Sequence, residues 1–187
     1  MVLPMKTVLF ATSNPFKVKE GNKIAKEFGI EFKQIRVNYP EIRDENIGKI
    51  AEEGVKFVFD KIKKPVIVED TGLFIRVLNG FPGPYSAYVY RKVGCSGILK
   101  LIHNSNDRSA EFITVIGFKN SSTLEIFGGK VKGIISEIER GSAGFGYDPI
   151  FIPEGYAKTF AEDPELKSKI SHRRKAFYKF CKWFSIL

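Results

Sequence analysis

Alternation of hydrophobic and polar positions divides the first third of the chain into apolar runs and amphipathic stretches. Residues 7–11 and 65–68 are short apolar runs typical of buried strands. Residues 18–28 and 47–59 carry apolar side chains at helical spacing, and Gly29 would end the first of these helices. Strands and helices that follow one another in this way indicate an α/β protein.

The middle of the chain changes to strand-like patterning. Residues 110–118, 124–130 and 131–139 predict three consecutive strands, with a polar turn at residues 120–122. A glycine-rich loop follows at residues 141–146.

Helical patterns flank this β-rich middle. Two short helices are predicted at residues 85–93 and 97–103, and a last helix begins near Ser171. Its buried stripe comprises Ala176, Phe177, Phe180, Cys181 and Phe184. We therefore expect residues 1–187 to form a single α/β domain, a mixed twisted sheet in two lobes flanked by helices, with a cleft between the lobes.

From the composition we expect a cytoplasmic protein. Hydrophobic residues make up 43% of the 187 positions, enough for a real core, and no apolar run approaches the ~18 residues of a membrane span. The first residues do not have the pattern of a signal peptide. Cys95 and Cys181 lack metal-ligand spacing, so we expect a reduced protein with inert or buried thiols.

The net charge of +9 indicates affinity for anions. Nucleic acid, a membrane surface and nucleotide phosphates all carry suitable charge, so charge alone does not identify the partner. Many basic residues gather late in the chain, at Lys158, Lys167, Lys169, Arg173, Arg174, Lys175, Lys179 and Lys182.

A polar turn, residues 12–17, connects the first predicted strand to the first predicted helix. Thr12, Ser13 and Asn14 supply hydrogen-bond donors, and Lys17 adds a full charge. Backbone N–H groups and the positive end of the helix dipole would face an anion there. The alternative interpretation is an ordinary N-capped helix with a solvated lysine.

Two carboxylates directly follow the apolar run at residues 65–68. Glu69 and Asp70 would point to opposite faces if the strand continued, so we expect only one of them in a given site. A carboxylate at a strand end suits Mg²⁺ binding or activation of water. The alternative is an acidic turn. Glu41, in a loop, is a candidate for a second metal oxygen.

Glycines flank an aromatic residue in Gly-Phe-Gly-Tyr-Asp, residues 144–148. The glycines let the backbone approach a ligand, and Phe145 or Tyr147 offers a flat face for a nucleobase. A hydrophobic plug over the core explains the pattern equally well.

Cations open the last helix, in Ser-His-Arg-Arg at residues 171–174. Positive charge opposes the helix dipole in a first turn, so an anionic partner is indicated, and Lys167 lies just upstream. A solvated basic cluster is the alternative. His172 has no partner residues at metal-ligand spacing.

Four segments match, in order, the motifs of one family. They are Thr-Ser-Asn-Pro-Phe-Lys at residues 12–17, Val-Glu-Asp-Thr-Gly-Leu at 68–73 with Gly-Phe-Pro-Gly-Pro-Tyr at 80–85, Phe-Gly-Tyr-Asp-Pro at 145–149, and Ser-His-Arg at 171–173. Over essentially its whole length the chain resembles the inosine triphosphate pyrophosphatase family, hydrolases of non-standard purine nucleoside triphosphates.

The resemblance implies hydrolysis of ITP, dITP or XTP between the α and β phosphates, which removes damaged nucleotides from the precursor pool. It also implies a Mg²⁺ requirement, with Glu41 and Asp70 as metal ligands and Asp70 as the base for the attacking water. Family members are typically cytoplasmic homodimers. The implied substrate-binding residues fall into groups: Thr12, Ser13, Asn14 and Lys17 at the triphosphate, Thr71 in contact with the substrate, Phe145, Gly146, Tyr147 and Asp148 around the base, and Lys167, His172 and Arg173 completing the pocket.

Two alternatives stay open at this point. A nucleic-acid-binding module would explain the charge, although no binding motif appears and the basic residues are not interleaved with exposed aromatic residues. A related hydrolase of pyrimidine or other modified nucleotides would share the same motifs. We expect a nucleotide substrate, no specific nucleic acid and no membrane.

Overall fold

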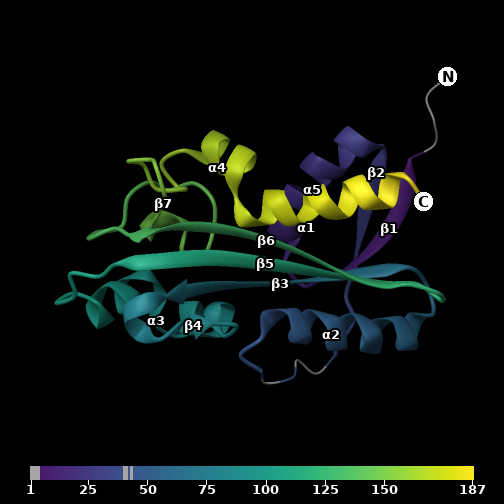
Figure 1. Cartoon of the computed structure of the whole chain (residues 1–187), viewed down its shortest axis with the longest axis horizontal. Coiled ribbons are helices and arrows are strands. Elements are labelled where there is room, and N and C mark those ends of the chain that lie inside the picture. Colours follow the sequence, from purple (N-terminus) through teal and green to yellow (C-terminus); the bar gives the residue numbers. More distant parts are fainter. Residues whose placement is uncertain (1–4, 40–41, 43) are drawn as a thin grey trace. The chain divides into compact units, whose positions relative to one another are not determined.

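The structure, a computed structural model, describes residues 5–39, 42 and 44–187. Within these ranges it contains a seven-stranded sheet in the order β2-β1-β3-β5-β6-β7, with β4 paired to β3 (Figure 1). The strands are β1 Lys6–Ala11, β2 Ile30–Ile35, β3 Val66–Ile75, β4 Pro82–Gly83, β5 Ser109–Lys119, β6 Leu124–Ile135 and β7 Phe151–Pro153. The helices are α1 Pro15–Ala25, α2 Ile47–Ile62, α3 Ser86–Leu101, α4 Pro164–Ile170 and α5 His172–Ser185.

The sheet is mixed, which confirms the predicted α/β class. Strand β1 pairs in parallel with β2 and with β3, and Leu9 lies opposite Val66 in the second of these pairs. Strands β3 and β4 pair antiparallel, as do β6 and β7. The parallel strands follow the helical connections that the sequence predicts.

The described chain consists of two compact units. Unit 1 comprises Met1–Asp70, Thr114–Gly129 and Arg173–Leu187, and unit 2 comprises Thr71–Ile113 and Lys130–His172. The cleft expected between two lobes stays a prediction.

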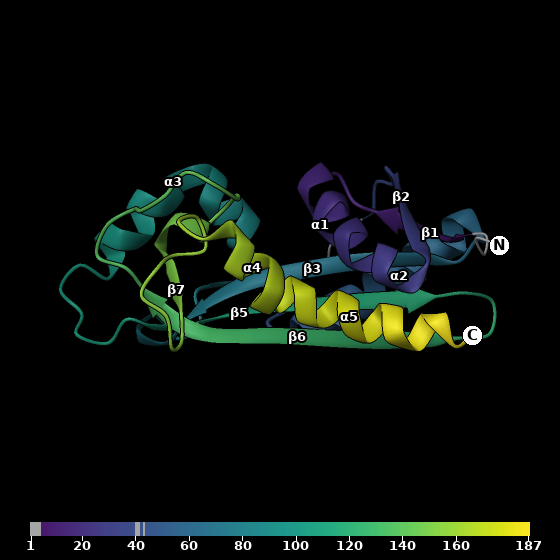
Figure 2. The ribbon, with the colours of Figure 1, turned by 90° about the horizontal axis from the view of Figure 1, so that it is seen from above.

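Unit 1 has helices on both faces of its part of the sheet. Helices α1 and α5 cover one face and α2 covers the other (Figures 1 and 2). A Cβ atom added at Gly21 of α1 would lie 2.9 Å from the ring of Phe177 in α5. One added at Gly117 of β5 would lie 2.7 Å from the carbonyl oxygen of Ala51 in α2. Glycine at both positions lets each helix pack closely.

The core of unit 1 is rich in phenylalanine. Phe10 and Phe177 pack edge-on with ring centroids 5.8 Å apart, a favoured aromatic arrangement. Four of the five residues in the stripe predicted for the last helix are fully buried, and Phe184 packs against them partly buried. Buried members of this core are Val8, Phe10, Ile24, Ala25, Ile30, Phe32, Ile67, Ile116, Phe118, Ala176, Phe177, Phe180 and Cys181.

The core of unit 2 centres on three phenylalanines from three segments. Phe112 of β5 lies 4.7 Å from Phe151 of β7, and Phe151 lies 5.3 Å from Phe160, between ring centroids. Helix α3 packs on this core through Val89, Cys95 and Ile98. At Gly94 the backbone of α3 leaves the helical conformation, with φ 62° and ψ −165°. Two short helices were predicted here, and the structure joins them at this break.

The helix ends follow the sequence signals. Asn14 caps α1, because its side-chain oxygen accepts a hydrogen bond from the N–H of Phe16. Asn46 caps α2 in the same way, since its side-chain oxygen accepts hydrogen bonds from the N–H groups of Gly48 and Lys49. After α1 a short 3₁₀ turn ends at Gly29, whose φ of 67° needs a left-handed conformation.

Two strand boundaries predicted from the sequence are wrong. Strand β3 does not end at Val68 but continues through the Glu-Asp-Thr-Gly segment to Ile75, where it pairs with β4. Gly72 permits that pairing, since a Cβ atom there would lie 2.5 Å from the carbonyl oxygen of Gly83. The two strands predicted at residues 124–130 and 131–139 form one strand, β6, because the burial alternation continues without a turn across Lys130 and Val131.

Helix α4 was not predicted. It is only seven residues long, so its periodicity is weak, but its start carries clear signals. Asp163 accepts a hydrogen bond from the N–H of Leu166, and Pro164 is the first helical residue. Together α4 and α5 place the residues on either side of Ser171 in two separate helices.

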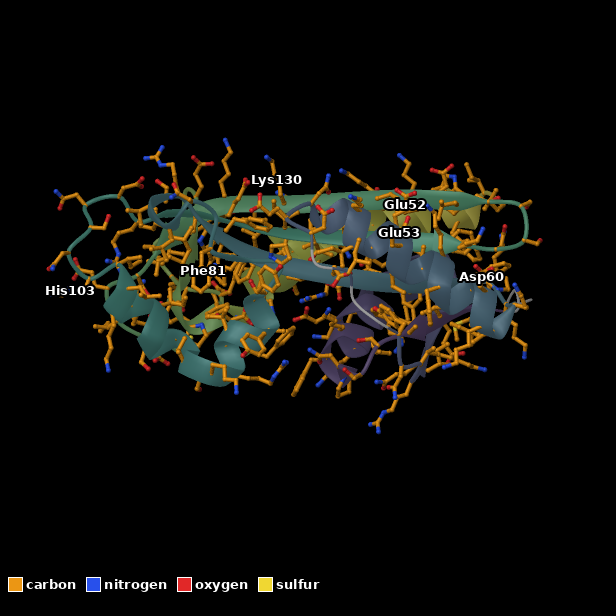
Figure 3. The ribbon with its side chains drawn as sticks, turned by 90° about the horizontal axis from the view of Figure 1, so that it is seen from below. Glu52, Glu53, Asp60, Phe81, His103 and Lys130 are labelled. Atoms are coloured by element: carbon orange, nitrogen blue, oxygen red, sulfur yellow. The ribbon has the colours of Figure 1, made fainter. Side chains whose placement is uncertain are left out.

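The outer face of α2 is solvated and carries ion pairs. Figure 3 shows Glu52, Glu53 and Asp60 along this helix. Glu52 and Glu53 both pair with Lys56, at 2.6 and 2.9 Å, and Asp60 pairs with Lys63. Among the described residues, no helix combines the length and apolar character needed to cross a membrane.

Candidate functional site

The polar turn after β1 is held by its own side chains and by β2. The N–H of Asn14 donates to Oγ1 of Thr12 at 3.1 Å, and Asn14 in turn caps α1. The backbone of Thr12 bonds to Ile35 and to the side chain of Gln34. Ser13 is exposed at the tip. The oxygens of Thr12 and Asn14 therefore accept hydrogen bonds within the turn. The N-cap of the alternative interpretation is confirmed, its solvated lysine is wrong because Lys17 bonds to Glu69, and anion binding stays a prediction.

Lys17 reaches from α1 to β3. Its Nζ donates to the carbonyl oxygen of Glu69 at 2.9 Å and lies 3.4 Å from Oε2 of the same residue. The Lys17 side chain is 19% exposed, whereas that of Glu69 is fully buried. The lysine charge is thus positioned by the strand that carries Asp70.

Arg173 completes a buried network that we call the ionic cluster: Lys17, Glu20, Glu69 and Arg173. Arg173 donates to Glu20 at 2.7 Å through Nη1 and to Glu69 at 3.2 Å through Nη2. Burial opposes its charge, but the carboxylates of Glu69 and Glu20 outweigh that effect and raise the pKa of Arg173. Thr114 of β5 adds a hydroxyl 3.4 Å from Glu69 Oε1.

This network explains how α5 tolerates arginine in its first turn. The positive end of the helix dipole disfavours a cation there, and two carboxylates of the protein itself offset that cost. Arg174, the next residue, pairs with Glu27. The basic opening of α5 is therefore bound to acidic side chains of unit 1.

Asp70 and Thr71 are neighbours in β3 and belong to different units, Asp70 to unit 1 and Thr71 to unit 2. Glu69 is 4% exposed, and Asp70 and Thr71 are half-buried. Glu69 pairs with Lys17 and Arg173, and the catalytic role of Asp70 stays a prediction. Glu41 lies outside the described residues.

The predicted magnesium site has one carboxylate, Asp70, among the described residues, and the site stays a prediction. No group of three or more His, Cys, Asp or Glu side chains among the described residues is arranged to hold a metal ion. Mg²⁺ characteristically takes one or two protein carboxylates and completes its shell with substrate phosphates and water. Asp70 is a carboxylate of that kind, and Glu41 would be the second.

The second group of predicted residues lies in unit 2, in the aromatic loop, residues 144–148. Gly144 and Gly146 have φ values of 81° and 63°, which favour glycine. A Cβ atom at Gly144 would lie 2.2 Å from Asp148 Oδ2. That oxygen accepts a hydrogen bond from the N–H of Phe145 at 2.7 Å, so the loop closes on itself.

Lys167 of α4 completes what we call the loop cluster: Phe145, Asp148 and Lys167. Its Nζ donates to Asp148 Oδ2 at 2.8 Å and lies 4.6 Å from the centre of the Phe145 ring. Both side chains of the ion pair are buried, at 6% and 3% exposed. Helix α4, which the sequence did not predict, is therefore the element that positions Lys167.

Two predicted binding residues of unit 2 belong to its interior. Tyr147 is 3% exposed and donates to the carbonyl oxygen of Ser86 at 3.3 Å. His172 is 2% exposed, and its ring stacks on Phe112 with centroids 4.6 Å apart. Tyr147 thus forms part of the hydrophobic plug, while Phe145 is half-buried and keeps accessible surface.

The structure brings the predicted residues together in two groups. Lys17 and Arg173 meet at Glu69 in unit 1, and Phe145, Asp148 and Lys167 meet in unit 2. Sequence reasoning missed Glu20 as a partner of Arg173. Its spacing of three residues from Lys17 was the available signal, because such residues share a helix face.

Comparisons with known proteins cover almost the whole chain. The sequence profile described as the Ham1 family matches residues 8–183. The chain is 49% identical over 179 residues to a protein of Methanopyrus kandleri named dITP/XTP pyrophosphatase, covering 95% of each chain. A protein of the same name from Thermococcus kodakarensis is 47% identical over 175 residues, covering 93% of this chain and 95% of that protein.

A solved structure agrees with these sequence matches. The HAM1 protein from Coxiella burnetii superposes with a TM-score of 0.84 at 27% sequence identity. The match covers 98% of this chain and 100% of that chain.

Proposed function

Because this chain belongs to the Ham1 family, we propose that it hydrolyses dITP, ITP and XTP between the α and β phosphates, giving the monophosphate and pyrophosphate. The enzyme class, a nucleoside triphosphate pyrophosphatase, follows from the family and from the names of its curated relatives. The bond cleaved and the preference among these substrates belong to the proposal.

One observation carries the proposal: the motif residues form two preassembled clusters of different chemistry. The ionic cluster gathers Lys17, Glu69 and Arg173 beside the turn that opens α1. The loop cluster places an aromatic ring next to a buried ion pair. A nucleoside triphosphate needs both kinds of surface, charge and helix N-terminus for phosphates and a flat face for the base.

In this proposal the polar turn and Lys17 bind the triphosphate. The N-terminus of α1 presents backbone N–H groups, and Lys17 supplies a charge held in place by Glu69. Asp70, the next residue along β3, accepts a proton from the attacking water. Thr71 and Arg173 are further substrate-binding residues in the proposal.

The aromatic loop selects the base. Phe145 offers its ring, and Lys167 offers N–H donors whose direction Asp148 fixes. Hypoxanthine and xanthine carry an acceptor oxygen at ring position 6, where adenine has an amine. A buried donor left without its acceptor is costly, so adenine is disfavoured. Gly146 belongs to the pocket wall, and the buried Tyr147 and His172 support that wall from the interior.

A bound Mg²⁺ would supply charge to neutralise the phosphates and the developing leaving group. Asp70 and Glu41 would hold it. The two cations and two anions of the ionic cluster cancel one another, so the cluster by itself brings little net attraction for a highly negative triphosphate. This balance favours a requirement for a divalent cation.

The proposal includes a cytoplasmic homodimer acting on the precursor pool. Both cysteines are free and buried, in keeping with a reducing compartment. Light scattering with size exclusion would measure the dimer directly.

Product analysis tests the proposed reaction. The protein is incubated with Mg²⁺ and ITP, and separately with XTP, ATP and GTP, and ³¹P NMR identifies the products. We expect monophosphate and pyrophosphate from ITP and XTP, and little turnover of ATP or GTP. Formation of diphosphate and orthophosphate would contradict the proposed bond cleavage.

The role of Asp70 is tested by Asp70→Asn against Asp60→Asn, a solvated carboxylate on α2. We expect Asp70→Asn to lower kcat by about 100- to 10,000-fold, the range of general base catalysis. Asp60→Asn should keep full turnover. A near-normal kcat for a folded Asp70→Asn protein would remove Asp70 as the base.

A further inference from the structure

Helix α3 holds the aromatic loop through three separate contacts. Tyr147 donates to the carbonyl oxygen of Ser86 at 3.3 Å. The ring of Tyr90 meets the ring of Tyr147 edge-on, with centroids 5.2 Å apart and an interplanar angle of 85°. The thiol of Cys95 lies 3.5 Å from the carbonyl oxygen of Gly146 and donates to it. Loop and helix are far apart in sequence but both belong to unit 2.

The break at Gly94 makes this arrangement possible. Ser86 and Tyr90 are four residues apart and share one face of a regular helix. Cys95, five residues after Tyr90, would point about 140° away from Tyr90 around the axis of an unbroken helix, given about 100° per residue. At Gly94 the backbone takes φ 62° and ψ −165°, a conformation open essentially to glycine alone. The chain therefore changes direction at Gly94, and the side chain of Cys95 contacts the aromatic loop as well.

Steric crowding does not explain why position 94 is a glycine. A Cβ atom added at Gly94 would find no other atom within 4 Å. The backbone conformation is therefore the feature that requires glycine at this position, because a side chain disfavours that combination of φ and ψ.

We propose that Gly94 and Tyr90 are positioning residues for base recognition: they fix the aromatic loop so that Phe145 and Asp148 keep the geometry of the loop cluster. Gly146 and Tyr147, the residues that α3 contacts, connect Phe145 to Asp148 along the chain. A tilt of this segment moves the ring and the carboxylate relative to each other. This inference rests on the proposed function of the loop as the base-binding element.

The variants separate the ring contact from general effects on α3. Tyr90→Leu removes the edge-on ring contact, and Tyr90→Phe keeps it. Tyr88→Leu is the matched control, because Tyr88 lies on the same helix with 56% of its surface exposed. Gly94→Ala tests the role of the break in α3. If the Gly94→Ala protein folds poorly, the Tyr90 variants still test whether α3 fixes the loop.

Two measurements are made on each variant. Amide hydrogen exchange of residues 144–148 without nucleotide reports the loop directly, through the N–H of Phe145 that bonds to Asp148. Steady-state kinetics with ITP and ATP report base recognition. The strength of an edge-on ring pair corresponds to about a 2- to 10-fold change in an equilibrium constant, so we expect changes of that size in exchange and in KM for Tyr90→Leu.

We expect kcat to change less than KM, and the preference for ITP over ATP to fall by a similar factor. Tyr90→Phe should restore wild-type exchange and KM, and Gly94→Ala should give the larger effect. Exchange rates in Tyr90→Leu equal to those in Tyr88→Leu would overturn the proposal. Faster exchange with unchanged KM and selectivity would also overturn it, since the loop would then be fixed without serving base recognition. Absence of ITP hydrolysis in the wild type is a failure of the proposed function and leaves the exchange result to decide whether α3 holds the loop.

Discussion

In both the ionic cluster of unit 1 and the loop cluster of unit 2, a buried basic side chain pairs with a carboxylate. The two clusters draw their residues from different kinds of structural element. The ionic cluster draws Lys17 and Glu20 from α1, Glu69 from β3 and Arg173 from α5. The loop cluster uses one ion pair and one ring, with two of its members inside a five-residue loop. The first depends on the packing of whole elements and the second on local backbone geometry.

Under the proposed function, this difference corresponds to the two halves of a nucleotide. Phosphates are recognised by charge at fixed points, which rigid helices and strands supply. A base is recognised by an aromatic ring that lies parallel to it. A short loop bounded by glycines can set the position of that ring, and a neighbouring helix can hold the loop in place. Four substitutions or conditions test the contrast.

Substitution of Arg173 should have the largest effect, and it should be on stability. Arg173→Met leaves Glu69 buried without its main cation, so we expect the free energy of unfolding to fall by about 3–5 kcal/mol. Arg174→Met removes the neighbouring, more exposed ion pair with Glu27 and should cost about 0.2–1 kcal/mol. Urea unfolding measures both variants.

Adding Glu69→Gln to Arg173→Met should recover part of the lost stability, because it removes the charge of the buried carboxylate that has lost its arginine. Equal losses in Arg173→Met and Arg174→Met would show that the ionic cluster contributes no more than a surface pair.

Substitution of Lys17 should affect phosphate binding more than base recognition. Loss of a charged hydrogen bond corresponds to about 1.5–3 kcal/mol, so Lys17→Met should weaken inhibition by tripolyphosphate about 10- to 150-fold. The control is Lys19→Met, an exposed lysine two residues along α1. A wild-type inhibition constant for Lys17→Met would show that Lys17 does not bind the phosphates.

Substitution of Phe145 should give the reverse pattern. Stacking of a base on an aromatic ring contributes about 1–3 kcal/mol, so Phe145→Leu should raise KM for ITP about 5- to 150-fold. Inhibition by tripolyphosphate should stay unchanged. Phe81→Leu, at a 41% exposed position of unit 2 shown in Figure 3, is the control. Weaker tripolyphosphate inhibition in Phe145→Leu would contradict the assignment of phosphates to one cluster and of the base to the other.

The smallest effect concerns a property that both units share. Burial raises the pKa of Cys95 in unit 2 and of Cys181 in unit 1 to about 12. Unfolded thiols ionise near pH 8.5, so the stability from these protonated thiols is complete below that pH and is lost as the pH rises toward 12. Between about pH 8 and pH 9 we expect a loss of about 0.7 kcal/mol per thiol.

Urea unfolding of the wild type and of the Cys95→Ala/Cys181→Ala protein at both pH values measures this loss. The variant should lack that part of the pH dependence. Identical pH dependence in the two proteins would mean that the buried thiols ionise as readily as unfolded ones.

Periodicity predicted most elements of the fold because their signals are local. Strand β1, helix α2 and the stripe of α5 each repeat over enough residues to be read from the sequence alone. The end of β3 was misplaced because Asp-Thr-Gly has the composition of a turn, while its pairing with Pro82 and Gly83 is a tertiary contact. Helix α4 was missed because seven residues give too weak a period.

The candidate site divides in the same way. Motif order identified Lys17, Asp148 and Lys167, but not that Lys17 and Arg173 meet at Glu69, because those residues are brought together only by the packing of α1, β3 and α5. The burial of His172 against Phe112 likewise depends on a ring from a distant strand. The sequence shows which side chain stands at each position, but it does not show which side chains the folded chain brings into contact.

The position of α5 in chain order has a consequence for synthesis. Phe177 and Phe180 enter the core of unit 1, yet they leave the ribosome after β1, β2 and every other strand of the sheet. Until then Phe10 and Phe32 lack these two ring partners on the face that α5 covers. The nascent chain therefore exposes an aromatic surface late in translation, the kind of surface that chaperones bind and that aggregates when synthesis stalls.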